Sequence, residues 1–228
     1  MEFRRALLDT CGDATDTVVI IDVLRAFSSA AYAFAARAPS ITLVATVEEA
    51  FELKRSMAGA LIMGEVDGLP VPGFDFSNSP ASFDRIDLTN HPMIQRTTRG
   101  TQGAVLSRNA KRLLTCSFCC AGATARLIRR ESRETVTFVI TGSGPGGKGD
   151  EDVACADFVE ALLKGETPDP GEFTKRVYDS PAGHRFLDPS EPDFPPLDLE
   201  HCVRVDRFDF AMAVTRQDGR LVMEAVWP

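Results

Sequence analysis

The chain has 228 residues, 44% of them hydrophobic, which is enough to bury a core without disulfides or a structural metal. Its net charge of −8 argues against a nucleic-acid-binding surface, because phosphate backbones are held by clustered Lys and Arg. No apolar run approaches the roughly 18 residues of a membrane helix. The six cysteines are unevenly spread. We therefore expect a soluble cytoplasmic protein with reduced thiols and with no nucleic-acid or membrane partner.

The stretch 18–29, VVIIDVLRAFSS, forms the first clear structural unit. Its four leading apolar residues predict a buried parallel strand, and Asp22 and Arg25 follow at the carboxyl end of that strand. Ser28 and Ser29 open an Ala-rich run that predicts a helix, whose first N–H groups favour an anion. Because open α/β sheets bind ligands at this end, the stretch is a candidate site, although a helix cap and a surface ion pair explain it equally well.

Strand and helix patterns then alternate along the chain. The expected strands cover 41–45, 60–63, 93–96, 113–116 and 135–140. The expected helices cover 46–57, 101–110, 119–131 and 150–164, and the first of them begins with a capping box. This alternation predicts an α/β fold with a mainly parallel sheet and helices on both faces. A long connection rich in Pro and Gly, residues 66–92, interrupts it and is a candidate functional loop.

The C-terminal part has a different pattern. One short helix is expected at 172–178, and residues 208–226 alternate around Asp218-Gly219, a pair typical of a two-residue hairpin turn. We expect this antiparallel hairpin at an edge of the sheet. The whole chain, 1–228, is then one domain, with its motifs in a core of about 15–165 and with a C-terminal extension at 166–228.

Carboxylates follow several of the expected strands, in loops that the fold brings to one edge of the sheet. They are Asp22, Glu65, Asp67, Asp75, Glu151 and Asp152. At an effective dielectric constant of about 20, a carboxylate roughly 4 Å from a phosphate charge costs on the order of 4 kcal/mol, so the two share a site only with a cation between them. Oxygen ligands of this kind suit Mg²⁺. The pattern therefore predicts Mg²⁺-assisted phosphoryl transfer to water, although Glu151 and Asp152 also fit the first turn of a helix for dipole reasons alone.

Several segments together resemble the 2-phosphosulfolactate phosphatase family, the ComB-like proteins. They are DVLRAFSS at 22–29, Gly64-Glu65, GFDFSNSP at 73–80, RTTRGTQG at 96–103, SFCCAGATA at 117–125 and the Gly-rich turn 142–147 that leads to Glu151-Asp152. The resemblance covers about residues 15–165. It implies a three-layer α/β/α fold with a mixed sheet, dependence on Mg²⁺, and hydrolysis of (R)-2-phospho-3-sulfolactate to sulfolactate and phosphate in coenzyme M biosynthesis.

On this hypothesis each candidate residue receives a role. Catalysis is assigned to Asp22, Arg25 and Glu65. The expected metal ligands are Asp22, Glu65, Asp75, Glu151 and Asp152. Phosphate is assigned to Arg25, as a bidentate partner, and to Ser28, Ser29 and the helix N-terminus. The second anionic group of the substrate, a carboxylate or sulfonate, is assigned to Thr97, Thr98, Arg99 and Gly100, and Ser77 and Asn78 are also assigned to the ligand. Two alternatives stay open for Asp22, which either attacks phosphorus itself or orients a water molecule.

Two other functions compete with this one. Cys120 and Arg126 have the C-x₅-R spacing of cysteine phosphatases, in which a thiolate at a helix N-terminus attacks phosphorus. By chance alone, 6 Cys and 20 Arg in 228 residues give roughly 0.5 such spacings, so this match carries little information. The second alternative is a non-catalytic protein that binds a phosphorylated metabolite on the same scaffold. The sequence also leaves a homo-oligomer open.

Overall fold

The computed structural model describes residues 1–131, 135–144 and 147–228, so Pro145 and Gly146 of the Gly-rich turn lie outside the described residues. The strands are β1 (Glu2–Leu7), β2 (Thr17–Ile21), β3 (Ile41–Leu43), β4 (Leu61–Gly64), β5 (Phe76–Ser77), β6 (Met93–Arg96), β7 (Arg112–Cys116), β8 (Thr135–Ile140), β9 (Ser143–Gly144), β10 (Gly147–Lys148), β11 (Ala211–Gln217) and β12 (Arg220–Val226). The helices are α1 (Ala26–Ala35), α2 (Val47–Ser56), α3 (Gly100–Leu106), α4 (Ala121–Glu131), α5 (Asp150–Lys164), α6 (Pro170–Tyr178), α7 (Pro181–Arg185) and α8 (Pro196–Cys202). Short 3₁₀ turns are η1 (Cys11–Asp13), η2 (Pro80–Phe83) and η3 (Phe118–Cys120).

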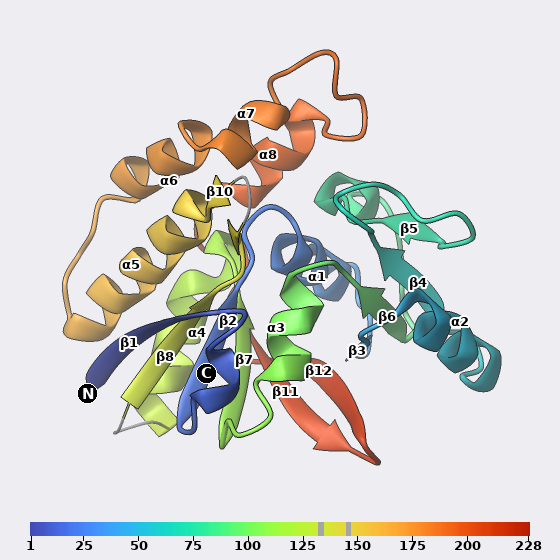
Figure 1. Cartoon of the computed structure of the whole chain (residues 1–228), viewed down its shortest axis with the longest axis horizontal. Coiled ribbons are helices and arrows are strands. Elements are labelled where there is room, and N and C mark those ends of the chain that lie inside the picture. The colour runs from blue at the N-terminus through green and yellow to red at the C-terminus, as the bar shows by residue number, and fades with distance from the viewer. Residues whose placement is uncertain (132–134, 145–146) are drawn as a thin grey trace.

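Within the described residues, ten strands form one mixed sheet in the order β1-β8-β2-β7-β11-β12-β3-β6-β4-β5. Strands β1, β8, β2 and β7 are mutually parallel, and so are β3, β6, β4 and β5. The hairpin β11–β12 joins these two groups through antiparallel pairs with β7 and β3 (Figure 1). The expected α/β fold with a mostly parallel, mixed sheet and a C-terminal antiparallel hairpin is confirmed.

The expected position of the hairpin is wrong. Residues of β11 pair with β7 and residues of β12 pair with β3, so the hairpin lies in the middle of the sheet rather than at an edge. The physical reason is that the alternating pattern predicts how the two strands of the hairpin pair with each other. It does not predict which other strands flank the hairpin, because that depends on which of its residues are buried in the folded protein. Met212 and Met223 are fully buried, as central strands require. The edge is instead formed at one end by β1, which the sequence analysis did not identify.

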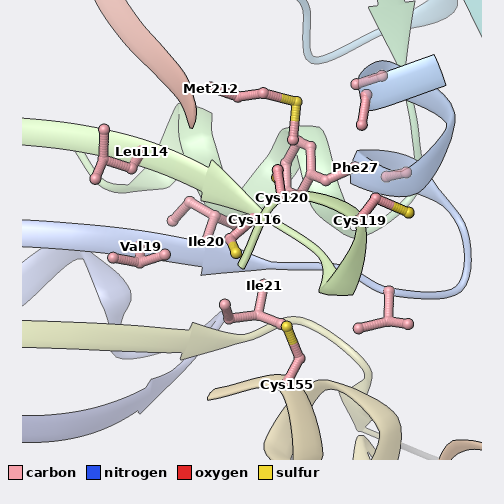
Figure 2. Close-up of a cluster of buried hydrophobic side chains, with 14 of the residues drawn as sticks. Val19, Ile20, Ile21, Phe27, Leu114, Cys116, Cys119, Cys120, Cys155 and Met212 are labelled. Atoms are coloured by element: carbon pink, nitrogen blue, oxygen red, sulfur yellow. The ribbon is translucent and has the colours of Figure 1, made fainter. Parts of the chain in front are cut away.

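Two layers of helices enclose β2, whose five residues are all buried. On one face, a Cβ on Gly103 of α3 would lie 2.7 Å from Cγ2 of Ile20, so this helix packs closely on the strand. On the other face, Ile21 points toward Cys155 of α5 (Figure 2). Helices α4 and α5 also contact each other, and α1 contacts α3. These contacts give the three layers expected of the fold.

Local signals in the sequence explain several helix boundaries. Thr46 caps α2 by accepting a hydrogen bond from the Glu49 N–H at 3.1 Å, and the Glu49 carboxylate accepts from the Ala45 N–H at 2.9 Å. Helix α5 ends at Gly165, which has a positive φ of 87° and suits a left-handed C-cap. None of the helices in the described part of the chain has the length and hydrophobicity needed to cross a bilayer.

Candidate functional site

A pocket of about 400 Å³ lies where loops from both parallel groups of strands meet. It receives residues that follow β2, β4, β6 and β8, together with the beginning of α5 and part of the segment around α7. Its lining consists of Asp22, Leu24, Arg25, Glu65, Asp67, Gly68, Asn78, Thr98, Arg99, Thr141, Gly142, Gly149, Glu151, Asp152, Pro181, Ala182, Arg185 and Phe194. The strand-end residues therefore gather in one place, as the sequence predicts for most of them.

Asp22 lies directly after β2 and is buried beneath α1. Its Oδ1 accepts a hydrogen bond from the Ala26 N–H at 3.0 Å, and its carbonyl oxygen accepts from the Phe27 N–H at 3.1 Å. The N–H groups of Ala26 and Phe27 at the beginning of α1 thus donate to Asp22, and the predicted phosphate cradle at this helix end stays a prediction. On the other side of the carboxylate, a Cβ on Gly100 would come within 2.7 Å of Oδ2. Gly100 therefore serves close packing against Asp22.

Glu151 and Asp152 lie in the first turn of helix α5, beside the loops that follow β2 and β8. Asp152 Oδ1 accepts from the Val23 N–H at 2.9 Å, and its Oδ2 accepts from the Gly142 N–H at 2.7 Å and from the Thr141 hydroxyl at 3.2 Å. This carboxylate therefore connects the loops that follow β2 and β8. A Cβ on Gly142 would lie 2.5 Å from Oε1 of Glu151, so the loop backbone approaches both acids closely.

The three acids share one electrostatic environment. Burial raises the pKa of Asp22 to about 7, and repulsion from Glu65 and Glu151 adds to this rise. Burial also raises the pKa of Asp152, with further repulsion from Glu151 and Asp22, and it raises the pKa of Glu151. Arg99 opposes the shift of Glu151. Without a further cation, the state in which Asp22, Glu151 and Asp152 are all ionised is therefore unfavourable.

Glu65 follows β4 and links two loops of the pocket. Its Oε1 accepts from the Thr98 N–H at 2.6 Å, while its Oε2 accepts from the Gly68 N–H and from the Thr98 hydroxyl at 3.1 Å. Asp67 also lines the pocket, and its N–H donates to the Thr98 hydroxyl at 2.7 Å. Glu65 thus has both oxygens engaged by the protein and fixes the position of the loop after β6.

Arg25 lines the pocket, but its guanidinium is occupied by protein groups. Nη1 donates to Oδ2 of Asp198 at 2.7 Å and to the Asp193 carbonyl at 3.0 Å, and Nη2 donates to the Gly68 carbonyl at 3.1 Å. The guanidinium lies over the ring of Phe194 at 4.8 Å. The Nη atoms of Arg25 therefore donate to protein oxygens, and its predicted bidentate pairing with phosphate stays a prediction.

The segment after β6 divides into lining and supporting residues. Thr98 and Arg99 line the pocket, and Arg99 Nη1 donates to the Thr141 carbonyl at 3.3 Å. Thr97 is buried behind them, where its hydroxyl oxygen accepts from the Thr101 N–H at 3.0 Å at the beginning of α3. The predicted ligand role of Thr97 is therefore not matched by its position.

Among the other predicted hydroxyl and amide residues, one lines the pocket and three do not. Asn78 lines the pocket and is 5% exposed, and its Oδ1 has no hydrogen-bond partner among the described residues. Ser77 belongs to β5 and does not line the pocket. Ser28 donates to the Val23 carbonyl at 2.7 Å, and Ser29 is buried within α1. None of these three serines lines the pocket, and their assignment to the ligand stays a prediction.

Asp75 does not reach the other acids. Its Oδ2 accepts from the Ile62 N–H at 2.7 Å and from Lys54 Nζ at 2.6 Å, and Asp75 is absent from the pocket lining. The expectation that Asp75 joins the metal ligands is therefore wrong. The long loop places this residue beside β4 rather than at the end of the strand, and a partner from α2 neutralises it.

The cysteine alternative has no matching geometry. Cys120 is fully buried, and the pKa of its thiol is raised well above its ordinary value by the neighbouring Cys116 thiol and by burial. Figure 2 shows it in the apolar cluster that also holds Cys116, Cys119 and Cys155. Arg126 is half exposed and pairs with Asp209. These residues therefore form no thiolate–guanidinium pair.

Some lining residues have no counterpart among the predicted ones. Thr141 and Gly142 follow β8, and Arg185 and Phe194 come from the C-terminal extension. The Gly-rich turn after β8 was a sufficient signal for the first two. No pattern in the Pro- and acid-rich segment identifies Arg185 or Phe194, because their place depends on how this segment folds back over the pocket.

The donor set fits a hard divalent cation. Within the described residues, no three His, Cys, Asp or Glu side chains converge as a complete metal site. Mg²⁺, however, usually binds through one or two carboxylates and keeps water or phosphate oxygens as its other ligands. Asp22 and Glu151 supply such carboxylates, and the raised pKa of each indicates that compensating charge is lacking.

Comparisons with known proteins agree with one another. A family model described as 2-phosphosulpholactate phosphatase matches residues 4–191. The chain is 34% identical over 207 residues to a probable 2-phosphosulfolactate phosphatase of Bacillus subtilis (strain 168), with 90% of each chain covered. It is 32% identical over 226 residues to a protein of the same name from Carboxydothermus hydrogenoformans, with 91% of this chain and 90% of the relative covered. A third relative of that name, from Thermoplasma acidophilum, is 28% identical over 211 residues, with 90% of this chain and 87% of the relative covered.

Proposed function

Because the chain belongs to the 2-phosphosulpholactate phosphatase family, a family of phosphoric monoester hydrolases, we propose that it hydrolyses a small phosphorylated acid with the help of Mg²⁺. The relatives' names suggest 2-phosphosulfolactate as the substrate, and we propose its (R)-2-phospho-3-sulfolactate form, with sulfolactate and phosphate as products. The observation that carries the proposal is the cluster of Asp22, Glu151 and Asp152 in one pocket, each with a raised pKa.

The residues of the pocket have separable tasks in this proposal. Asp22 and Glu151 would hold Mg²⁺, with Asp152 fixing the loops that carry them through its bonds to Val23 and Gly142. A bound Mg²⁺ would neutralise these acids and polarise the phosphoryl group toward attack by water. Arg99, on the same wall, supplies positive charge for the oxygens of the phosphoryl group. Glu65 keeps Thr98 and the following Arg99 in position.

The test is release of inorganic phosphate from phosphorylated three-carbon acids, sulfonated and not, with Mg²⁺ and with EDTA. We expect turnover with Mg²⁺, loss of turnover with EDTA, and a fall of at least about 100-fold in kcat for Asp22→Asn. Asp87→Asn is the matched control, because Asp87 is an exposed acid that pairs with Arg37 and does not line the pocket. If none of the esters is hydrolysed by the unmutated protein, the enzyme proposal fails and a binding protein is the remaining function.

The thiol alternative has its own test. Cys120→Ser should keep turnover within about twofold, because the buried Cys120 thiol does not line the pocket and its raised pKa disfavours a thiolate. Circular dichroism before the assay checks that the variant is folded. A large loss of turnover in a folded Cys120→Ser protein would contradict a metal-dependent mechanism.

A further inference from the structure

Helix α7 brings a guanidinium to the pocket from outside the sequence motifs. Arg185 Nε and Nη2 donate to the Glu191 carboxylate at 3.3 and 2.9 Å, and its guanidinium lies 3.7 Å from the ring centroid of Phe194. Nη1 makes no hydrogen bond with any described residue, and the side chain is 42% exposed. Arg185 is therefore held in a fixed orientation by its neighbours while two of its donors remain available.

Arg185 and Arg99 lie beside different lining residues of the pocket. A Cβ on Gly68 would lie 2.8 Å from Cζ of Phe194 and 3.6 Å from Nη1 of Arg185, so Nη1 is beside the Gly68 loop. Arg99 instead donates to the Thr141 carbonyl, next to the acids of α5. The pocket thus has one guanidinium on the wall of the acid cluster and another on the wall formed by Gly68 and Phe194.

Arg25 also lines this part of the pocket, but its Nη groups are not available to a ligand. Both Nη atoms of Arg25 donate to protein oxygens, and its guanidinium is buried against Asp198. An anion that enters beside Gly68 therefore meets Arg185 as its accessible partner. The planar array of N–H donors on a guanidinium matches the oxygens of a carboxylate or sulfonate.

We propose that Arg185 binds the second anionic group of the substrate, a carboxylate or sulfonate, and thereby selects phosphate esters that carry an acid. The inference rests on the proposed function and deepens it, because it assigns the acid group to the part of the pocket formed by Gly68 and Phe194. Phe194 and Glu191 act as positioning residues that hold the Arg185 guanidinium in place.

The experiment compares two esters that differ by one anionic group, 2-phosphoglycerate and glycerol 2-phosphate. For Arg185→Gln we expect KM for 2-phosphoglycerate to rise about 10- to 100-fold, as loss of a hydrogen-bonded charge predicts, with kcat changed little. For glycerol 2-phosphate we expect kcat/KM within about twofold of the unmutated protein. Arg185→Lys keeps the positive charge and loses the planar array of N–H donors. Its KM for 2-phosphoglycerate should therefore lie between those of the unmutated protein and Arg185→Gln.

Arg55→Gln, at an exposed position of α2, is the matched control and should change neither ester. A purely structural role of Arg185 would lower activity on both esters alike, and that result would overturn the proposal, as would an unchanged KM for 2-phosphoglycerate. If the unmutated protein hydrolyses neither of these esters nor a sulfonated phosphorylated three-carbon acid, the proposed function fails. Calorimetric titration of 2-phosphoglycerate then decides: at least tenfold weaker binding by Arg185→Gln supports the inference, and equal or absent binding to both proteins overturns it.

Discussion

At the scale of single residues, Asp22 is a buried acid whose pKa is raised from 3.8 to about 7 by burial and by the neighbouring acids. Between these two pH values the folded protein retains a proton that the unfolded chain has already lost. The contribution of Asp22 to stability is therefore fully present below about pH 3.8 and is lost as the pH rises through about 7. The free energy of unfolding therefore changes with pH in the opposite direction to that expected for an acid in an ion pair.

The first prediction concerns Asp22→Asn in metal-free buffer. Asn cannot ionise, so the free energy of unfolding of Asp22→Asn relative to the unmutated protein should increase between pH 4 and pH 7 and level off above. We expect the increase to exceed about 1 kcal/mol, since one pKa unit corresponds to about 1.4 kcal/mol. Urea titrations with EDTA at each pH measure it.

Asp87→Asn gives the control for this prediction. The Thr89 N–H lowers the pKa of Asp87, so its stabilising contribution is present above its unfolded pKa and is lost as the pH falls. Replacing Asp87 should therefore give a small effect of the opposite sign. An Asp22→Asn difference that does not change with pH would contradict a raised pKa for Asp22.

Residue patterns predicted part of this site. Asp22, Glu65, Glu151 and Asp152 were identified because each follows a strand or begins a helix, and a parallel sheet brings such positions together. The partners of Arg25 and Asp75 could not be predicted in the same way. The buried Asp198 and the half-exposed Lys54 are 173 and 21 residues away from them along the chain, and no local pattern reports such a pairing.

At the scale of elements, the C-terminal segment is attached to the pocket through Asp198 of α8. This acid is fully buried; its Oδ2 accepts from Arg25, and its Oδ1 accepts from the Ser79 hydroxyl at 2.7 Å and the Ala81 N–H at 3.2 Å. It thereby joins α8 to the loop after β2 and to η2. Phe194, just before α8, completes the attachment by packing against the Arg25 guanidinium.

The second prediction follows from this attachment. Asp198→Ala leaves the Arg25 guanidinium buried without its carboxylate and should lower the free energy of unfolding by about 3–5 kcal/mol. Asp209→Ala removes the carboxylate of a solvent-exposed ion pair with Arg126 and should cost no more than about 1 kcal/mol. Urea denaturation of both variants measures the contrast. Equal losses would show that α8 is held by its apolar contacts alone.

At the scale of the whole molecule, the twist of the sheet explains how the pocket forms. Three antiparallel pairings separate β7 from β3, so the two parallel groups run in opposite senses along the sheet. Six pairings lead from β2 to β4, and a twist of about 20–25° at each accumulates to on the order of 120–150°. This rotation compensates for most of the opposite direction of the two groups of strands. The carboxyl ends of β2 and β4 therefore converge near α7 and α8 (Figure 1).

The sequence alone could not predict this route to the pocket. Patterns of period 2 and 3.6 identify most of the elements, including β6 and β8, but they say nothing of the order of strands in the sheet. Asp22 and Glu65 do line one pocket, as the alternating pattern predicts. The assumption that their strands end at the same edge of one parallel sheet is incomplete, because the two strands belong to groups that run in opposite senses. What brings them together is the inserted hairpin β11–β12 and the twist that it continues.

The third prediction uses the stability of the whole molecule to report on the proposed Mg²⁺. A ligand that binds only the folded state at about 100 times its Kd adds about 2.7 kcal/mol of stability. For a domain of this size we expect Tm to rise by about 5–10 °C at pH 8, where Asp22 is mostly ionised and attracts the cation. At pH 5 the rise should be much smaller, because a proton then competes with Mg²⁺ for the acid cluster.

Matched variants separate this effect from a general influence of salt. Glu151→Gln removes one expected ligand and should abolish most of the rise in Tm at pH 8, whereas Asp87→Asn should retain it. Differential scanning calorimetry with MgCl₂, and with NaCl at equal ionic strength, provides the comparison. Because both variants lose one carboxylate, a rise in Tm that survives in both would mean that Mg²⁺ acts on the general surface charge, and the acid cluster would then have to be neutralised by protons or by Arg99 instead.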